Sequence, residues 1–434
     1  METILFAGVC GRALGTVAMD LAETGIRVLG FDRAFYPPVS DRLDASKVVV
    51  LEEEEALVNL DEVDLVIAGA MMGRGTKVVE SALDRRIPVL SLPRFLEERF
   101  LRKSRNIVVA GTNGKTTTTA MITHILNEAG IQPDYLVGGE CDSVGAPARF
   151  RGAEWSVLEG DEFVAGFGDR NPKFLYYRPE ILVVTNLSFD HPEVYRDERE
   201  YRQAFAYLVQ QVPRNGVIIL GADKKLDFLA ERAACEVKRI DTKSNKVELS
   251  IPGRFNVTNA AAAMMVAESC EIDSGLAAKA LLGFSGVKGR FEMMHDQDGL
   301  TVIVDDGYHA TAIEEVLSEI ADAAGGKEIV VAYVPRFTGG SDQSQQENLP
   351  TAMARANKVV WSRPLNYRVF SEAPFDLGRF SRDLLERDVE SHAVEAIKEI
   401  PGEVREVLSK PSVVLLSIGP GPHRMEEWVK TIAE

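Results

Sequence analysis

The chain has 434 residues, 45% of them hydrophobic and 26% charged, a composition typical of a folded globular protein rather than a disordered or fibrous one. At roughly 150 residues per domain, this length predicts several domains, and about three is our working number. The formal net charge of −17 argues against non-specific nucleic-acid binding, because an acidic surface repels the phosphates.

Cysteine spacing and hydropathy bear on the cellular compartment. The four cysteines are widely spaced and form no C-x-x-C pair, so neither a zinc knuckle nor a disulfide framework is indicated. No apolar run reaches about 18 residues, and no signal-peptide pattern precedes the first expected strand. We therefore expect a cytoplasmic protein without a membrane segment, and the sequence makes no prediction of its oligomeric state.

The first part of the chain predicts a strand, a glycine-bearing turn, a helix and a second strand. The strands are expected at residues 4–7 and 27–31, and the helix between them ends near Thr24. Further apolar runs alternate with helical stretches, so a small parallel sheet should fill residues 1–104. Those runs are at 48–51, 65–68 and 88–90, and the acidic run 52–55 predicts an exposed helix start.

Two more α/β domains are expected, over residues 105–294 and 295–434. The second has expected strands at 107–110, 155–158, 181–185 and 217–220, and helices at 115–128 and 257–268. The third has expected strands at 300–304, 328–333, 359–361 and 413–418, with helices between them. The polar stretch 338–348 predicts a loop or a lid.

The segment Gly111-Thr-Asn-Gly-Lys-Thr116 is a shortened relative of the G-x-x-x-x-G-K-[ST] phosphate loop, and it lies between an expected buried strand and an expected helix. Backbone N–H groups at a helix N-terminus bind phosphate oxygens. Lys115 is expected to reach the β- and γ-phosphates, and the Thr116 hydroxyl to ligate Mg²⁺. The alternative is a glycine-rich turn with a surface lysine.

Polar groups follow two expected strands of the central domain. Glu159-Gly-Asp-Glu162 comes after the first and Thr185-Asn-Leu-Ser-Phe-Asp-His191 after the second, so both should lie at the carboxyl edge of a parallel sheet, where α/β domains bind ligands. Acidic groups and a histidine beside a phosphate loop favour a metal or phosphate role. The alternatives are a solvated turn and a structural histidine.

Three smaller features carry weaker signals. Asn256 and Asn259 begin an Ala-rich helix, where they contact a ligand or serve only as N-cap and first-turn residues. Arg290, at the expected domain boundary, either reaches a phosphoryl group or is a solvated linker residue. In the first domain, the glycine loop at 8–15 is no G-x-G-x-x-G fingerprint, and Asp32 either accepts from a ribose hydroxyl or belongs to a turn.

Six motifs in this order resemble the Mur ligase family across nearly the whole chain. Besides the three already quoted at 111, 159 and 185, they are Pro252-Gly-Arg-Phe-Asn-Val-Thr-Asn259, Gly286-Val-Lys-Gly-Arg-Phe-Glu292 and Val304-Asp-Asp-Gly-Tyr-His-Ala-Thr311. The resemblance implies an α/β, three-domain architecture: an N-terminal Rossmann-like domain for a UDP-sugar, a central P-loop ATPase domain and a C-terminal Rossmann-like domain for the amine substrate.

The resemblance also implies roles for individual residues. It assigns catalysis to Lys115, Arg290 and His191, and magnesium to Thr116, Glu159 and His191. The implied ATP contacts are Gly111, Thr112, Asn113, Gly114, Lys115, Thr116, Thr117, Asn256, Asn259, Arg290 and Asp306. The implied UDP-sugar contacts are Gly8, Gly11, Arg12, Gly15, Asp32 and Arg74.

Within the family, the chain looks most like the ligases that attach recycled L-Ala-γ-D-Glu-meso-diaminopimelate to UDP-N-acetylmuramate in peptidoglycan recycling. The features that carry this likeness are the segments 36–40, 70–75 and 169–179. The segment 334–341 departs from the tripeptide enzymes, so ligation of L-alanine or another amine is the first alternative. The second alternative is a non-catalytic paralogue that binds nucleotide or UDP-sugar.

Overall fold

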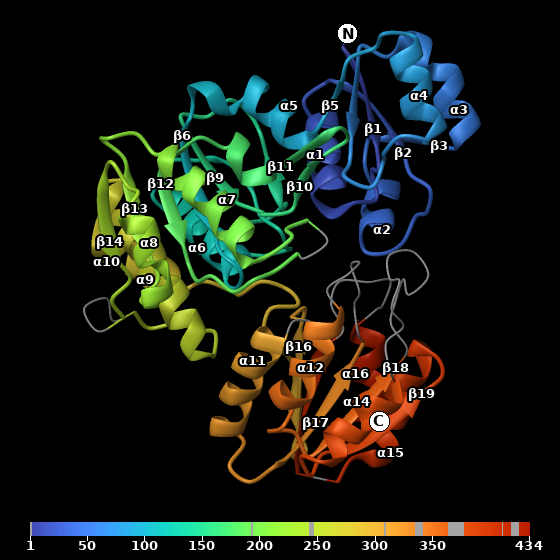
Figure 1. Ribbon diagram of the computed structural model, residues 1–434, viewed down its shortest axis with the longest axis vertical. Helices are drawn as coiled ribbons and strands as arrows, with labels where there is room; N and C mark the ends of the chain where they lie inside the picture. The colour runs from blue at the N-terminus through green and yellow to red at the C-terminus, as the bar shows by residue number, and fades with distance from the viewer. Residues whose placement is uncertain are drawn as a thin grey trace. The chain divides into compact units, whose positions relative to one another are not determined.

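The computed structural model describes residues 2–191, 194–242, 247–307, 310–334, 342–362, 377–409, 411–417 and 425–434. The chain folds into two compact units. The first comprises Met1–Phe189, Asp197–Ile251 and Phe255–Ser285, and the second comprises Asp190–Arg196, Pro252–Arg254 and Gly286–Glu434. The first unit contains two parallel-type sheets and the second contains one (Figure 1).

The N-terminal sheet has the order β3-β2-β1-β4-β5, and all its strands are parallel. The strands are β1 Thr3–Ala7, β2 Arg27–Phe31, β3 Val49–Leu51, β4 Leu65–Ala68 and β5 Val89–Leu90. The helices are α1 Arg12–Ala22, α2 Val39–Asp44, α3 Glu53–Asn59, α4 Lys77–Asp84 and α5 Leu92–Arg99. Because β1 lies at the centre, the loop after it opens at the point where the strand order reverses, which is where such sheets bind ligands.

The central sheet has the order β14-β13-β12-β6-β9-β7-β8, with β8 antiparallel to β7 and the other pairs parallel. The strands are β6 Arg105–Ala110, β7 Asp134–Leu136, β8 Ala148–Arg149, β9 Trp155–Glu159, β12 Pro179–Val184, β13 Val217–Leu220 and β14 Glu236–Arg239. The helices are α6 Lys115–Glu128, α7 Glu198–Gln210, α8 Asp227–Ala230, α9 Arg254–Ser269 and α10 Ser274–Leu282. The neighbours β9, β6 and β12 therefore end at one edge, and this edge carries the candidate site.

A short hairpin joins the two sheets of the first unit. It consists of β10 Val164–Gly166 and β11 Asp169–Pro172, and Phe167 between these strands packs against the core of the N-terminal sheet. The N-terminal and central domains are thus in direct contact through side chains.

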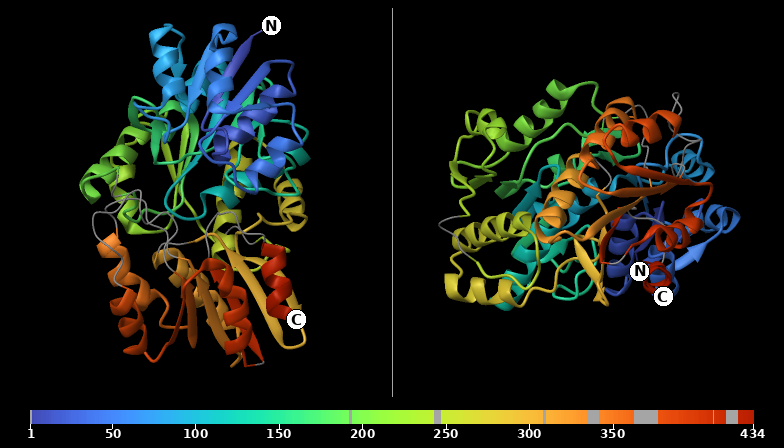
Figure 2. Two further views of the ribbon diagram at one scale, coloured as in Figure 1. Left: turned by 90° about the vertical axis from the view of Figure 1, so that its right-hand side faces the viewer. Right: turned by 90° about the horizontal axis from the view of Figure 1, so that it is seen from below.

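The third sheet has the order β15-β16-β20-β17-β18-β19, with β15 antiparallel to β16 and the other pairs parallel. The strands are β15 Glu292–Gln297, β16 Leu300–Asp305, β17 Glu328–Tyr333, β18 Lys358–Ser362, β19 Glu390–Val394 and β20 Ser412–Ser417. The helices are α11 Ala310–Ala323, α12 Asp342–Ala352, α14 Leu377–Leu385, α15 Ile400–Val407 and α16 Met425–Ala433. Helices cover both faces of this sheet (Figures 1 and 2), and the core under α15 and α16 contains Val404 and Trp428 packed against alternate strand residues.

The expected elements agree with the structure except at one helix. The stretch 338–348 was expected to be a loop or a lid. The loop prediction is wrong from Asp342 onward, where the chain forms α12, because Gln and Glu residues favour a helix despite their polarity. Residues 338–341, the Tyr308-His309 pair and Ile418 lie outside the described residues. In the described part of the chain, no helix has the length and apolar character needed to cross a membrane.

Candidate active site

The phosphate-type loop runs from the end of β6 to the start of α6. Gly114 is the N-cap residue of α6 and has a φ of 82°, a conformation that favours glycine. The loop is held from the next strand along the sheet, since Asn113 N donates to Asn186 Oδ1 at 2.8 Å and Thr112 N to the Asn186 carbonyl at 3.2 Å. The loop shape and the N-terminus of α6 are those of an anion site.

Asn259 on α9 lies directly against the loop. A Cβ atom at Gly114 would come within 2.6 Å of Asn259 Oδ1, so only glycine fits here without displacing the amide. Asn259 is 6% exposed, and its amide nitrogen donates to Asn256 Oδ1 at 3.3 Å. Both asparagines lie in the first two turns of α9, and neither is its N-cap.

Lys115 is the first residue of α6 and folds back over its own loop. Its ammonium donates to the Gly111 carbonyl at 2.6 Å and forms an ion pair with Glu162 at 3.0 Å. Burial disfavours the charged form, but the neighbouring carboxylates, Glu162 first among them, outweigh burial and raise the pKa of Lys115 above its ordinary value. The lysine therefore stays charged, as a phosphate-binding cation must.

Glu159 ends β9 beside the first turn of α6. Its Oε1 accepts from the Thr116 hydroxyl at 3.0 Å, and its Oε2 accepts from Gly138 N at 2.8 Å. Two of the three predicted magnesium ligands, Thr116 and Glu159, are thus in direct contact with each other.

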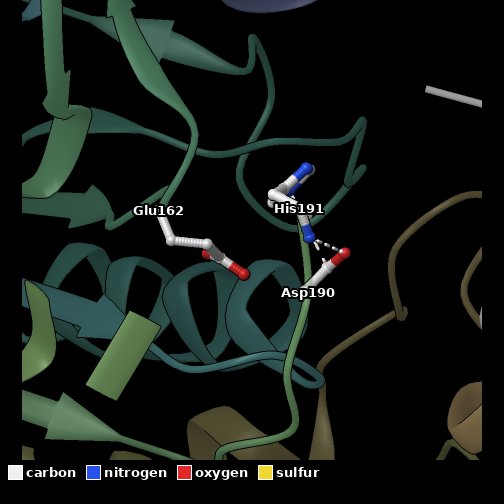
Figure 3. Close-up of side chains that lie close together, drawn as sticks. All are labelled: Glu162, Asp190 and His191. Carbon is white, nitrogen blue, oxygen red and sulfur yellow. Dashed lines mark hydrogen bonds and ion pairs between the residues drawn. The ribbon is translucent and has the colours of Figure 1, made fainter. Parts of the chain in front are cut away.

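A second group of potential ligands consists of Glu162, Asp190 and His191 (Figure 3). Each offers one ligand atom, and these atoms lie within 4.8 Å of one another. Glu162 is fully buried, and Tyr201 donates its hydroxyl to Glu162 Oε1 at 3.4 Å. Two carboxylates with an imidazole are a donor set that fits a divalent cation, and the oxygen ligands suit magnesium or manganese.

His191 is the member of this group that was predicted by name as a ligand, whereas Glu162 and Asp190 were predicted only as parts of the two motifs with a metal or phosphate role. Both lie inside the quoted motifs, and Glu162 is the fourth residue of Glu159-Gly-Asp-Glu162. Residue type alone cannot tell which carboxylate of such a cluster turns toward the loop lysine. The backbone path after β9 decides this, and it buries Glu162 against Lys115.

The first glycine loop follows β1 in the N-terminal domain. Gly8 N donates to the Phe31 carbonyl at 2.7 Å, and Cys10 N donates to Asp32 Oδ2 at 2.8 Å. Asp32 therefore binds the loop itself, and burial raises the pKa of this carboxyl group. Gly11 is the N-cap residue of α1, so the helix N-terminus opens at this loop.

Other predicted UDP-sugar contacts lie at different positions around this loop. Arg12 begins α1, and Gly15 is buried on that helix. Arg74 lies in the loop after β4, where its 74% exposed side chain pairs with Glu80 at 2.8 Å. The structure thus brings Gly8, Gly11 and Asp32 together, whereas Gly15 lies where α1 packs against α2.

Arg290 and Asp306 lie side by side in the second unit. Arg290 Nη1 is 4.0 Å from Asp306 Oδ2, and Asp306 N donates to the Gly289 carbonyl at 2.7 Å. The preceding residue, Asp305, is buried and accepts from Phe291 N at 2.8 Å. The end of β16 therefore fixes the segment that carries Arg290.

Comparisons with known proteins match the first two domains to family models. Residues 3–103 match the model "Mur ligase family, catalytic domain", and residues 109–240 match "Mur ligase middle domain". A crystal structure of a murein peptide ligase from Psychrobacter arcticus 273-4 has a TM-score of 0.75, with 24% identity, and the likeness covers 100% of this chain and 99% of that one. The fold is therefore shared over the whole length.

Two curated relatives are similar over most of the chain. UDP-N-acetylmuramate–L-alanyl-γ-D-glutamyl-meso-2,6-diaminoheptandioate ligase from Escherichia coli (strain K12) is 30% identical over 383 residues, 82% of this chain and 84% of the relative. UDP-N-acetylmuramate–L-alanine ligase from Rubrobacter xylanophilus is 33% identical over 378 residues, 81% of this chain and 82% of the relative. The chain belongs to the Mur ligase family, with its three-domain architecture, and is an ATP-dependent acid–amino-acid ligase.

Proposed function

We propose that this enzyme joins the tripeptide L-Ala-γ-D-Glu-meso-diaminopimelate to UDP-N-acetylmuramate through an acyl phosphate, in peptidoglycan recycling. The observation that carries the acyl-phosphate chemistry is the charged Lys115 at the phosphate-type loop, in contact with the carboxylate Glu162. The choice of substrates is supported by the relative in Escherichia coli, which is named for this acid and this peptide.

The loop and its neighbours supply the nucleotide site. Residues 111–117 bind the phosphates, with Asn256 and Asn259 beside them. Arg290, at the domain boundary, also contacts the nucleotide, and Asp306 contacts it from the third domain. Thr116 and Glu159 would hold one magnesium ion, and His191 with Glu162 and Asp190 would hold another. A bound magnesium ion would neutralise charge on the phosphates.

The reaction has two steps. A lactyl carboxylate oxygen of UDP-N-acetylmuramate bonds to the γ-phosphorus, the bond to the ADP oxygen breaks, and an acyl phosphate and ADP result. The peptide amine then bonds to the acyl carbon, phosphate leaves, and the nitrogen loses a proton. Positioning and charge stabilisation carry most of this catalysis, and we assign Lys115 and Arg290 to the transferred phosphoryl group.

The second candidate amine is L-alanine. The relative in Rubrobacter xylanophilus is named for it and is similar over almost the same share of the chain. The first half-reaction is the same for both amines, so the choice between them concerns only the third domain.

A panel of amines tests the proposal. The purified protein is given ATP, Mg²⁺ and UDP-N-acetylmuramate with the tripeptide, with L-alanine or with no amine, and ADP release is followed. We expect sustained ADP release only in the reaction that contains the tripeptide. Sustained release with L-alanine instead would transfer the assignment to that amine, and no release with either would contradict both amine assignments.

Variants of the loop link this activity to the site. Lys115→Ala should abolish ADP release, because the phosphates lose their fixed cation. Gly73→Ala is the control, since its added methyl group would have no atom within 4 Å, and its release should equal that of the unmodified protein. Normal turnover in Lys115→Ala would refute the assignment.

A further inference from the structure

The hairpin at the edge of the central sheet is held from several sides. We call residues 134–151 the edge hairpin; it contains β7 and β8, which pair in antiparallel register, and a further bridge between Cys141 and Gly145. It lies within the first unit, as do the N-terminal domain and the phosphate-type loop. Its contacts link it to the N-terminal domain on one side and to the nucleotide site on the other.

The first link to the N-terminal domain comes from α1. Asp20, whose side chain is 8% exposed, accepts from Phe150 N at 2.8 Å and pairs with both terminal nitrogens of Arg151 at 2.9 Å. The backbone N of Arg151 donates in turn to Asp134 Oδ1 at 2.7 Å, at the other end of the hairpin. Because the N-terminus of α1 forms the first glycine loop, the hairpin is coupled to that loop through one rigid helix.

The second link comes from α2. Arg42 Nη1 lies 3.4 Å from Glu140 Oε1, and their side chains are 29% and 34% exposed. The same helix packs closely on α1, since a Cβ atom at Gly15 would lie 2.8 Å from Val39 Cγ1. The two helices beside the first loop therefore both contact the edge hairpin.

The opposite link leads to the nucleotide site. Gly138, two residues before Glu140, donates its N–H to Glu159, the carboxylate that also accepts from the Thr116 hydroxyl. A Cβ atom at Gly138 would approach Glu159 Oε2 to 2.5 Å, so the contact is close. A change in the position of Glu159 must therefore displace the hairpin backbone at Gly138.

The hairpin tip is also attached to the helix that carries Lys115. The ring of His124 on α6 lies with Nδ1 3.1 Å from the Ser143 carbonyl oxygen. Ser143 N and its hydroxyl both contact the Ser285 hydroxyl, at 3.2 and 2.8 Å. The tip is thus fixed relative to α6.

We propose that the edge hairpin couples the two substrate sites, so that ATP·Mg²⁺ at Thr116 and Glu159 increases the affinity of the N-terminal domain for the UDP-sugar. Asp20, Arg42 and Glu140 are positioning residues in this coupling. The inference rests on the proposed function for the identity of the two ligands. Linkage requires that the UDP-sugar increase nucleotide affinity by the same factor.

The Arg42–Glu140 pair offers the cleanest variant. Neither residue belongs to the nucleotide or sugar machinery, and a pair exposed to this degree contributes little to folding. Removing it by Glu140→Gln should reduce the coupling factor by about two- to fivefold, the effect of losing one such pair. Glu98→Gln is the control, because Glu98 pairs with Arg94 at 3.1 Å on α5 and its side chain is 37% exposed, close to the 34% of Glu140.

The test measures the Kd of UDP-N-acetylmuramate by calorimetry, with and without a non-hydrolysable ATP analogue and Mg²⁺. We expect the analogue to lower Kd in the unmodified protein and in Glu98→Gln, and to lower it less in Glu140→Gln, whose Kd without analogue is unchanged. A merely structural defect would instead raise Kd in both conditions, and this result would overturn the proposal.

Two further outcomes distinguish a failure of the coupling from a failure of the proposed function. An equal coupling factor in Glu140→Gln and the unmodified protein, or no coupling in the unmodified protein, overturns the proposal and leaves the proposed function standing. Absence of UDP-N-acetylmuramate binding to the unmodified protein overturns the acid substrate of the proposed function and, with it, the sugar end of the coupling.

Discussion

Lys115 and Glu162 form an ion pair in which the lysine side chain is 14% exposed and the glutamate is fully buried. Replacing Lys115 with Met leaves a buried carboxylate without its cation. We expect a loss of about 3 kcal/mol in the free energy of unfolding, measured in urea without nucleotide, because breaking one side of a buried pair strands the other charge. The double variant Lys115→Met, Glu162→Gln should recover part of this loss, and equal losses in the two variants would contradict the pairing.

The same pair predicts a dependence on pH. The folded protein raises the pKa of Lys115 above its ordinary 10.5, so the stabilisation is fully present below that value and is lost as the pH rises through the folded-state pKa. The stability difference between the unmodified protein and Lys115→Met should therefore shrink in strongly alkaline solution. Urea unfolding at about pH 8 and about pH 11 checks this, and a difference that grows with pH would contradict it.

Only part of the geometry of the candidate site could be predicted from the sequence. The spacing of Gly111 to Thr116 predicts the loop, the helix and the position of Lys115, because these depend on local geometry. Contacts made across the sheet cannot be predicted from such local spacing. The approach of Asn186 to Asn113, and of Glu162 to Lys115, depends on the strand order β9-β6-β12, which no local pattern specifies.

At the scale of elements, the packing of α1 against the loop before it gives a stability prediction. A methyl group at Gly15 would lie 2.3 Å from the Val9 carbonyl oxygen and 2.8 Å from Val39, and a backbone atom cannot easily move. Gly15→Ala should therefore cost about 2 kcal/mol of unfolding free energy, as overpacking does. Gly73→Ala should change the free energy of unfolding by less than about 0.5 kcal/mol. An unchanged free energy of unfolding in Gly15→Ala would show that α1 is loosely packed.

The strands were predictable from the sequence because most are buried on both faces and read as unbroken apolar runs, such as β6 and β13. The helix α12 was not, since its first residues lack an apolar stripe. Seven strands in the described part of the chain were also missed. Of these, β7, β8, β10 and β11 are only two to four residues long, and β14, β15 and β19 lie at sheet edges and lack an apolar run.

For the whole molecule, the order of motifs predicted the family and the three sheets, and the matches over residues 3–103 and 109–240 confirm the family. The contact between the first two domains was not predictable. It depends on single side chains such as Asp20 and Phe167, which no motif marks.

In the proposed reaction the carboxylate is activated as an acyl phosphate, and the fate of its oxygen reports on this step. UDP-N-acetylmuramate labelled with ¹⁸O in the lactyl carboxylate is turned over with ATP, Mg²⁺ and the tripeptide, and the inorganic phosphate is analysed by mass. One ¹⁸O atom should appear in the phosphate, because the carboxylate oxygen that attacks the γ-phosphorus leaves with it. Amide product accompanied by unlabelled phosphate would contradict the mechanism.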